Sequence, residues 1–369
     1  MVRIMTVLHR LSCKRVFIHG GYGIGNVGDE AVIAGILEKI RTMNHDCEVI
    51  VSSYDPRETA IRYGVKSVKS WTLQALRWIA GSDVVLIGGG LIVGPLLKYG
   101  RSALYRLLSG KFCLVSASIG KLLGKDVHFI SIGVEDYPDI ISKILLAPIL
   151  NRCNTVSVRD TLSRDVLQRH RVSKHIAVAI DPAFHLSTAS DSQVKRIFAK
   201  NDIPLDKKLI GLSARSLKDP ILNEKILRSL YKTVNWLLGI DLDHCVVYFP
   251  HWIAKKSYST FDDDLRTYQL LKDRMNANAN ERFKLLGDNN PRNVKAAYSF
   301  MKFSICMRYH SVIFNEAVGT PYVAIQYAPK VTALLTAFNK RSFGLPLDQL
   351  SFQSLRDLIT EKLLKSGSI

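Results

Sequence analysis

Three glycines near the N-terminus stand in the spacing that binds the pyrophosphate of a dinucleotide cofactor. Gly23, Gly25 and Gly28 form the pattern Gly-x-Gly-x-x-Gly within the stretch GGYGIGNVGDEAVIAGIL. The apolar run 16–18 precedes them and a helical pattern follows, which is the strand–loop–helix context that such a site requires. Taken alone, the glycine spacing therefore indicates nicotinamide or flavin chemistry.

The two residues after this motif argue against a bound pyrophosphate. Asp29 and Glu30 stand at the start of the expected helix, where free N–H groups and the helix dipole would otherwise attract an anion. A dinucleotide site also needs an acidic residue about 20 positions further on, to bind the ribose. The second expected strand instead ends at Ser53, and the nearest acid is Asp55. We therefore expect a tight structural turn, or a loop that presents Asn26 and Asp29 to another ligand.

The chain carries a large basic surplus. It has 369 residues and a formal net charge of +19, in a composition that is otherwise ordinary for a globular protein. Such a surplus attracts polyanions, anionic lipid surfaces or small acidic substrates, although most of these charges can equally be solvated surface. The basic residues are scattered along the sequence, which argues against a disordered basic arm.

The cysteines indicate a reducing compartment. None of the six forms a C-x-x-C pair, and Cys113, Cys245 and Cys306 lie in apolar runs, where a thiol behaves as a small hydrophobic group. We therefore expect a cytoplasmic protein. The stretch 91–123 is apolar with interspersed Lys and Arg, so it could lie on a membrane surface, although a buried helix with basic edges also fits. Peripheral contact with an anionic membrane stays open.

Short β-branched runs alternate with longer helical periods, which is typical of parallel sheets covered by helices on both faces. Strands are expected at 16–18, 48–51, 84–87, 127–132, 155–158, 176–180, 208–212, 245–249, 282–285, 303–306 and 322–325. Helices are expected at 29–41, 71–80, 102–108, 139–150, 161–168, 222–238, 261–275, 292–299, 311–318 and 331–338.

The alternation breaks once, at 181–192, where a proline and a cluster of Ser, Thr and Asp predict a linker. The break divides the chain into an N-terminal α/β domain at 1–185 and a C-terminal α/β domain at 193–346, with a last helix in 347–369. We predict two Rossmann-like domains with a cleft between them. Ligands of such sheets bind at the carboxyl ends of the strands.

Several short motifs follow one another along the chain, at or after the expected strands. They are Gly-Tyr-Gly-x-Gly-Asn-x-Gly-Asp-Glu-Ala from Gly21, Ile87-Gly-Gly-Gly90, Ser157-Val-Arg-Asp160, Asp181-Pro-Ala183, Arg308-Tyr-His310, Asn315-Glu-Ala317, Gly319-Thr-Pro321 and Tyr327-Ala-Pro-Lys330. In this order the motifs resemble the polysaccharide pyruvyl transferase family, from 16 to 330.

The resemblance implies a fold like that of the GT-B glycosyltransferases and a transfer of pyruvyl from phosphoenolpyruvate onto two hydroxyls of a sugar, giving a ketal. The acceptor would be a polysaccharide, a glycolipid or a nucleotide- or lipid-linked precursor of the cell envelope. The first domain would face this acceptor and the second would hold the donor. By analogy, Arg308, His310 and Lys330 correspond to the catalytic donor-site motif, and Arg159 and Arg215 match substrate-binding arginines.

The chemistry of phosphoenolpyruvate suits these residue types. Guanidinium groups such as those of Arg159, Arg215 and Arg308 bind carboxylate and phosphate through paired hydrogen bonds, and the ammonium of Lys330 can hold phosphate as a point charge. His310 can move protons, because imidazole titrates near neutrality. Ordinary surface charges, and a histidine that caps a helix or is satisfied in the core, are the alternatives.

The remaining expected contacts come from the glycine turns. Asn26 and Asp29, with the backbone of Gly25, Gly89 and Gly90, would contact the acceptor. No cluster of metal ligands is evident, so we expect no metal and no cofactor, with phosphoenolpyruvate as co-substrate.

Weaker candidates and other functions stay open. Glu135 and Asp136 could supply a base, and His251 with its aromatic neighbours could stack on a sugar. The alternatives are a nucleotide-sugar glycosyltransferase, whose ribose-binding acid would have to be Glu316, and a non-catalytic basic binding module. No nucleic-acid motif is present, so we expect no nucleic-acid partner. The oligomeric state is not predicted.

Overall fold

The computed structural model describes residues 15–70, 72–94, 112–137, 140–253 and 263–364. The chain forms two compact units. The first unit comprises Met1–Ile24 and Asp29–Leu186, and the second comprises Gly25–Gly28 and Ser187–Ile369. The helix predicted at 102–108 lies outside the described residues. The assignment of an acceptor role to one unit and a donor role to the other stays a prediction.

The first unit contains a parallel sheet in the order β3-β2-β1-β4-β6-β7-β8, with β5 beside β6. Its strands are β1 (Arg15–His19), β2 (Glu48–Ser53), β3 (Lys66–Lys69), β4 (Val84–Gly88), β5 (Leu91–Val93), β6 (Asp126–Val134), β7 (Thr155–Val158) and β8 (Ile176–Val178). The strand order reverses between β1 and β4, where ligands of such sheets bind. Both glycine turns follow these two strands.

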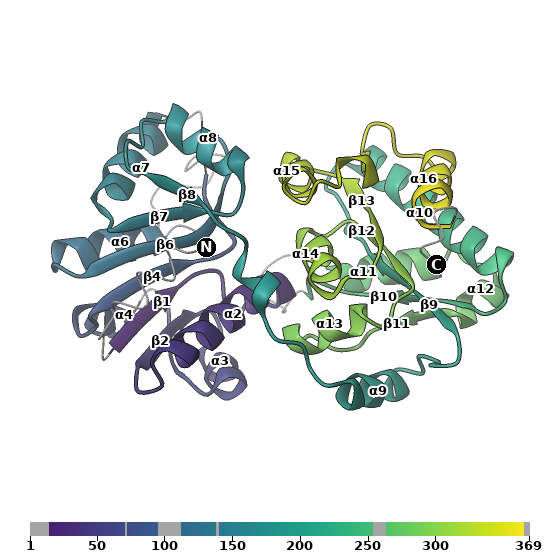
Figure 1. Ribbon diagram of the computed structural model, residues 1–369, viewed down its shortest axis with the longest axis horizontal. Helices are drawn as coiled ribbons and strands as arrows, with labels where there is room; N and C mark the ends of the chain where they lie inside the picture. Colours follow the sequence, from purple (N-terminus) through teal and green to yellow (C-terminus); the bar gives the residue numbers. More distant parts are fainter. Residues whose placement is uncertain (1–14, 71, 95–111, 138–139, 254–262, 365–369) are drawn as a thin grey trace. The chain divides into compact units, whose positions relative to one another are not determined.

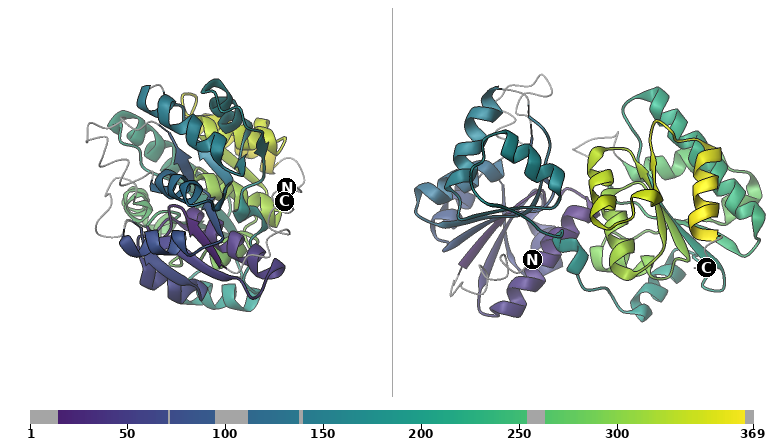
Figure 2. Two further views of the ribbon diagram at one scale, coloured as in Figure 1. Left: turned by 90° about the vertical axis from the view of Figure 1, so that its left-hand side faces the viewer. Right: turned by 45° about the horizontal axis from the view of Figure 1, so that its top comes forward.

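Helices cover both faces of this sheet (Figures 1 and 2). They are α2 (Val27–Met43), α3 (Pro56–Tyr63), α4 (Leu73–Ala80), α6 (Phe112–Leu122), α7 (Ile140–Arg152), α8 (Thr161–Arg169) and the 3-10 turn η1 (Pro182–His185). Several begin where a polar side chain accepts a hydrogen bond from the first turn, as Asp55, Thr72 and Asp160 do. The strands themselves are almost continuously apolar, because both of their faces are covered.

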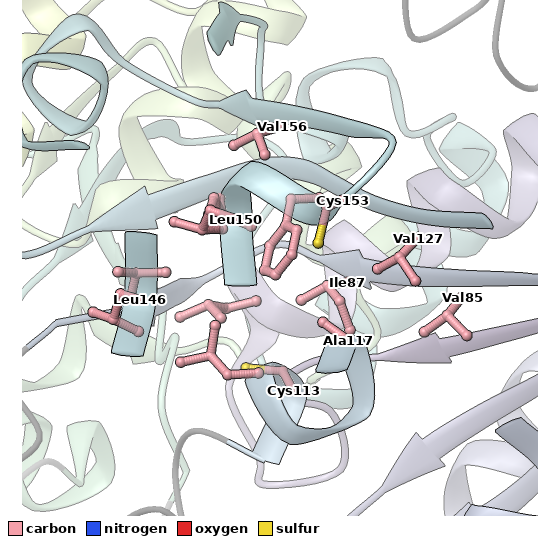
Figure 3. Packing of buried hydrophobic residues seen from close by; sticks show 14 of the residues in the cluster. Val85, Ile87, Cys113, Ala117, Val127, Leu146, Leu150, Cys153 and Val156 are labelled. Atoms are coloured by element: carbon pink, nitrogen blue, oxygen red, sulfur yellow. The ribbon is translucent and has the colours of Figure 1, made fainter. Parts of the chain in front are cut away.

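The core of the first unit lies between the sheet and its helices. Figure 3 shows Ile87 and Val127, from β4 and β6, facing Ala117 on α6 and Leu150 on α7. All four side chains are buried. The inward faces of α6 and α7 are therefore fully used in holding the unit together.

The second unit repeats the topology. Its parallel sheet has the order β11-β10-β9-β12-β13-β14, so the strand order reverses between β9 and β12. The strands are β9 (Lys208–Ser213), β10 (His244–Tyr248), β11 (Phe283–Leu285), β12 (Phe303–Cys306), β13 (Tyr322–Gln326) and β14 (Gly344–Pro346).

Helices again cover both faces of this sheet (Figures 1 and 2). They are α9 (Asp191–Lys200), α10 (Pro220–Ile240), α11 (Asp264–Lys272), α12 (Ala277–Glu281), α13 (Pro291–Tyr298), α14 (Tyr309–Val318), α15 (Pro329–Ala337) and α16 (Phe352–Ile359), with η2 (Arg341–Phe343) and the π-helical η3 (Thr360–Leu364). Proline occupies the first turn of α10, α13 and α15, where its missing N–H has no intrahelical partner in any case.

The predicted fold class is confirmed as two parallel α/β sheets with helices on both faces. The elements that the sequence pattern missed are short or polar: β3, β5, β14, α3, α9 and α12. Helix α6 lies within the stretch 91–123, where a buried helix with basic edges is one of the two interpretations. Helix α9 begins at Asp191, inside the stretch that we expected to be irregular. Its serine and aspartate residues form the start of a helix rather than part of a linker.

Acid should destabilise the first unit through its buried histidines. Burial lowers the pKa of His128 to about 4, and its Nδ1 lies 2.9 Å from the Thr155 hydroxyl. The unfolded chain takes up this proton near pH 6.5 and the folded chain does not, so the stability is full above pH 6.5 and is lost as the pH falls towards 4.

The free energy of unfolding of the wild type should fall between pH 7.5 and pH 5.5. We expect this fall to be ~1.4 kcal/mol smaller in His128→Gln. Urea unfolding at the two pH values measures this difference. His45→Gln, the same change at an exposed position, controls for the loss of a histidine as such. An unchanged difference for His128→Gln would contradict the argument.

Candidate functional site

Three predicted cations follow three neighbouring strands of the second sheet. Ser213, the last residue of β9, is in register with Cys306, the last residue of β12. Arg215 and Arg308 each lie two residues beyond these strand ends, on either side of the strand reversal. Lys330 lies in the first turn of α15, after β13, which pairs with β12. The topology therefore brings all three to one edge of the sheet.

These cations converge on Tyr327. The Arg215 guanidinium lies 5.0 Å from the centre of its ring, and Lys330 Nζ lies 5.4 Å from it. Burial by itself raises the pKa of the Tyr327 hydroxyl, but the charges of Lys330, Arg215 and Arg308 outweigh burial, and the pKa is lowered. A lowered phenol pKa in a buried position indicates positive charges around the ring. Tyr327 thus lies among Arg215, Arg308 and Lys330.

Arg308 is held by a buried carboxylate. Its Nε donates to both oxygens of Asp264, at 3.2 and 3.0 Å, and its Nη2 also donates to Asp264 Oδ1. Asp264 is fully buried and accepts from the backbone N–H groups of His251 and Trp252, at 2.9 and 3.0 Å. Burial raises the pKa of this carboxyl group, and Arg308 and the two N–H donors oppose the rise. These bonds fix the direction of the Arg308 guanidinium.

His310 is almost fully buried at the start of α14. Gly28 lies against its imidazole, since a Cβ atom on Gly28 would overlap His310 Nδ1. The segment around Gly28 is tied to the second unit: the Ile253 N–H donates to the Gly25 carbonyl (3.1 Å), and the Val27 N–H donates to the His251 carbonyl (2.9 Å). The last glycine of the motif, Gly28, is therefore needed because any side chain there would overlap the imidazole of His310.

His251 is a buried neighbour of Arg308 and His310. Its Nε2 lies 2.8 Å from the Tyr298 hydroxyl, and its side chain is buried. Burial, then the charges of His310 and Arg308, holds the pKa of His251 well below its usual value. The ring is therefore neutral, and it serves as a hydrogen-bond partner of a buried tyrosine rather than as a proton carrier.

The glycine turn after β1 already contains an anion. The Gly23 N–H donates to Glu30 Oε1 at 2.7 Å, and the Tyr63 hydroxyl donates to Glu30 Oε2 at 2.5 Å. Glu30 is buried on the first turn of α2. A pyrophosphate at this turn would have to displace that carboxylate. The hydrogen bond between Gly23 and Glu30 thus supports the expectation that no dinucleotide binds here.

The other predicted acceptor contacts fall into both units. In the first, Gly89 and Gly90 have positive φ, and an added Cβ at Gly90 would lie 2.8 Å from Asp29 Oδ1. These glycines let the loop after β4 lie against α2. Asn26 and Gly25 belong to the second unit, and Asn26 Oδ1 accepts from the Gly28 N–H at 2.9 Å. Their contact with an acceptor stays a prediction.

Arg159 lies in the first unit, directly after β7. Its guanidinium is buried against the backbone of Gly133, where an added Cβ would lie 2.6 Å from Nη2, and its Nε is 3.6 Å from Asp160. Arg215, Arg308 and Lys330, in contrast, belong to the second unit. Asp136, a weaker candidate base, has its Oδ1 2.7 Å from His170 Nε2.

The described residues contain neither a cluster of metal ligands nor a membrane-spanning helix. In the ranges given above, no group of three or more His, Cys, Asp or Glu side chains is placed to hold a metal ion. No helix within those ranges is long and apolar enough to cross a membrane. The expected absence of a metal and the expected compartment remain predictions.

Replacing Gly28 by alanine should damage the site although the position is helical. Alanine in a helix is usually more stable than glycine by up to about 1 kcal/mol, but here the new methyl group would overlap His310. We expect Gly28→Ala to lower the melting temperature. Gly239→Ala, in α10 with no neighbour within 4 Å of the new atom, should raise it. Thermal unfolding compares the two, and equal shifts would contradict the contact.

Solved structures that resemble the chain share its fold at low sequence identity. S. aureus MnaA, solved with UDP, matches with a TM-score of 0.60 and 13% identity, over 96% of this chain and 90% of that one. A UDP-GlcNAc 2-epimerase from Methanocaldococcus jannaschii matches at 0.58 and 12%, over 96% and 94%. E. coli ADP-heptose LPS heptosyltransferase II matches at 0.54 and 12%, over 95% and 99%. These are GT-B enzymes, so the GT-B-like fold is confirmed.

Sequence comparison identifies the family. No curated protein matches the chain. The family model for polysaccharide pyruvyl transferase matches residues 26–329, which include all of the motifs except the first five residues of the glycine motif and Lys330. The resemblance drawn from the motifs is thereby confirmed, and the chain belongs to the polysaccharide pyruvyl transferase family.

Proposed function

We propose that this protein transfers the pyruvyl group of phosphoenolpyruvate to a sugar of a cell-envelope glycan or its precursor, forming a ketal and releasing phosphate. The observation that carries the proposal is the convergence of Arg215, Arg308 and Lys330 on Tyr327. Family membership supplies the reaction class.

The charge of the site suits this donor. Phosphoenolpyruvate carries a carboxylate and a phosphate on the same carbon atom, so several fixed cations must meet it at once. Asp264 balances the charge of Arg308, which leaves Arg215 and Lys330 as the surplus that attracts the ligand. Because Asp264 also fixes the Arg308 guanidinium, little side-chain freedom is lost on binding.

His310 is the proposed proton carrier. As one sugar hydroxyl attacks the central carbon of the donor, the methylene carbon takes up a proton; a second hydroxyl then displaces phosphate. Both hydroxyls lose a proton: one proton replaces that given to the methylene carbon and the other leaves with phosphate, so a group that alternates between acid and base is needed. His310 lies two residues from Arg308 and contacts the backbone at Gly28, which restricts its imidazole to one position.

The first unit is proposed to bind the acceptor. Asp29 and the turn at Gly89 and Gly90 lie at the reversal of its sheet. This edge is where parallel α/β sheets bind their ligands. The acceptor would be a polysaccharide, a glycolipid or a nucleotide- or lipid-linked sugar.

A nucleotide-sugar glycosyltransferase of the same fold is disfavoured. Such an enzyme would need an acid to contact the ribose, and Glu316 is the residue that the sequence offered. Glu316 Oε2 instead accepts from Lys340 Nζ at 2.8 Å and from the Tyr322 hydroxyl at 2.9 Å. Its carboxylate is engaged within its own unit.

Donor binding can be tested without an acceptor. We expect phosphoenolpyruvate, but not a UDP-sugar, to raise the melting temperature, because a ligand that binds only the folded state stabilises it. Arg215→Gln and Lys330→Gln should each weaken this binding about tenfold to hundredfold, the usual worth of a hydrogen bond to a charged group. Titration calorimetry measures the change.

The matched control is Lys272→Gln. Lys272 Nζ lies 5.6 Å from the ring centre of Tyr268, so the variant removes a similar lysine–tyrosine contact from the same unit. Its affinity for phosphoenolpyruvate should equal that of the wild type. Catalysis is followed as phosphate release with a panel of glycans, and as the mass of the ketal product. Absence of both donor binding and phosphate release would reject the proposed function.

Replacing Asp264 alone should destabilise the protein more than replacing both Asp264 and Arg308. Asp264→Asn leaves Arg308 buried without a counter-charge, which costs about 3–5 kcal/mol of unfolding free energy. The double variant Asp264→Leu with Arg308→Met buries no unpaired charge and should be less destabilised, although it cannot bind the donor. Denaturant unfolding of both variants checks the order, and a double variant less stable than Asp264→Asn would be inconsistent with it.

A further inference from the structure

Large aliphatic side chains are exposed on α7 and at the end of α6 in the first unit, although surface helices usually carry polar side chains there. Leu122, at the end of α6, is 85% exposed, and Leu123 follows it at 48%. On α7, Ile144 is 63% exposed and Leu145 is 40% exposed. Single exposed aliphatic residues are common, but contiguous apolar surfaces usually mark a binding face.

The inward faces of the same helices are already committed to the core. Cys113 and Ala117 on α6, and Leu146 and Leu150 on α7, are buried against the sheet (Figure 3). The two helices also pack against each other. Helix α7, with the sequence IISKILLAPILNR, is therefore apolar on both sides. Helices that are apolar all round normally lie in a protein core or in lipid.

The charged side chains within α6 and α7 are all basic, and an exposed acid, Asp126, follows α6. Neither α6 (FCLVSASIGKL) nor α7 contains an acidic residue, and their charged side chains are Lys121, Lys143 and Arg152. Lys125 follows α6, and the neighbouring Asp126 accepts from Asn154 Nδ2 at 2.5 Å. The exposed aliphatic side chains are thus accompanied by cations.

We propose that this α6–α7 surface, comprising Leu122, Leu123, Lys143, Ile144, Leu145 and Arg152, docks the protein onto an anionic phospholipid membrane. Leucine and isoleucine side chains enter the boundary between headgroups and acyl chains, while lysine and arginine bind lipid phosphates. A second copy of the chain fits less well, because two surfaces of the same positive sign repel each other.

The surface also lacks what a nucleic acid would need. Its exposed large side chains are aliphatic, so they offer no ring on which a base could stack. The net charge of +19 adds a long-range attraction to any negatively charged bilayer. Membrane docking therefore accounts for both the apolar and the basic character of the two helices.

Sedimentation with lipid vesicles tests the proposal on the full chain, in the absence of phosphoenolpyruvate and acceptor. We expect binding to vesicles that contain phosphatidylglycerol, weak binding to pure phosphatidylcholine, and a loss of binding as salt rises. Lys143→Gln and Arg152→Gln should each weaken the affinity about fivefold. Leu122→Ser with Ile144→Ser should abolish sedimentation at protein and lipid concentrations where the wild type binds.

The matched control is Ile61→Ser with Leu73→Ser. These two side chains are 76% and 75% exposed and belong to the same unit, on α3 and α4. The control variant should sediment like the wild type, and both double variants should keep the wild-type melting temperature.

Three results would overturn the proposal: no sedimentation with anionic vesicles at low salt, equal effects of the two double variants, or a wild-type dimer that Leu122→Ser with Ile144→Ser converts to a monomer. The last would assign the surface to a second copy. Because no donor is present, failure here leaves the proposed transferase activity untouched.

Discussion

The buried carboxylate of Asp264 is the contact on which the second unit's site depends. A fully buried charge is tolerated only when it is paired and saturated with hydrogen bonds. Asp264 meets this condition through Arg308 and the backbone of His251 and Trp252, so it joins the start of α11 to the loops after β12 and β10. The His251 carbonyl in turn receives the Val27 N–H. One charge thus fixes the cation, the loop and the glycine segment beside His310.

The topology of the second sheet determines where Arg215 and Arg308 lie, whereas the ion pair with Asp264 only orients Arg308. The strand order reverses between β9 and β12, which is the place where parallel α/β sheets usually bind their ligands. Arg215 and Arg308 lie on either side of this reversal, because each is two residues beyond the end of its strand. The same reversal in the first unit lies beside the two glycine turns. The sheet sets where ligands approach, and the side chains set which charge they must carry.

Much of the fold follows from the sequence because buried parallel strands are continuous apolar runs. The predictions at 155–158 and 303–306 agree with β7 and β12 at both ends. Edge strands such as β3 (KSVK) escaped because half of their residues face solvent. The three cations could be found from their positions after strands. Asp264 could not, because it is one of three consecutive aspartates before a helix, and Asp263 is the N-cap. Gly28 appeared to belong to a phosphate loop, although its partner is His310.

The Glu30 carboxylate gives the first glycine turn an unexpected meaning. The turn has the glycine spacing of a nucleotide-binding loop, with positive φ at Gly23 and Gly25, yet its Gly23 N–H donates to a carboxylate of the chain itself. Glycine spacing therefore reports the path of the backbone and not the identity of the ligand. Glu30, held by Tyr63, occupies the hydrogen-bond donor that a cofactor phosphate would use. The turn therefore connects strand and helix without needing a ligand. Proteins of this architecture could exchange the two roles through that single side chain while the sheet, the turn and the helix stay as they are.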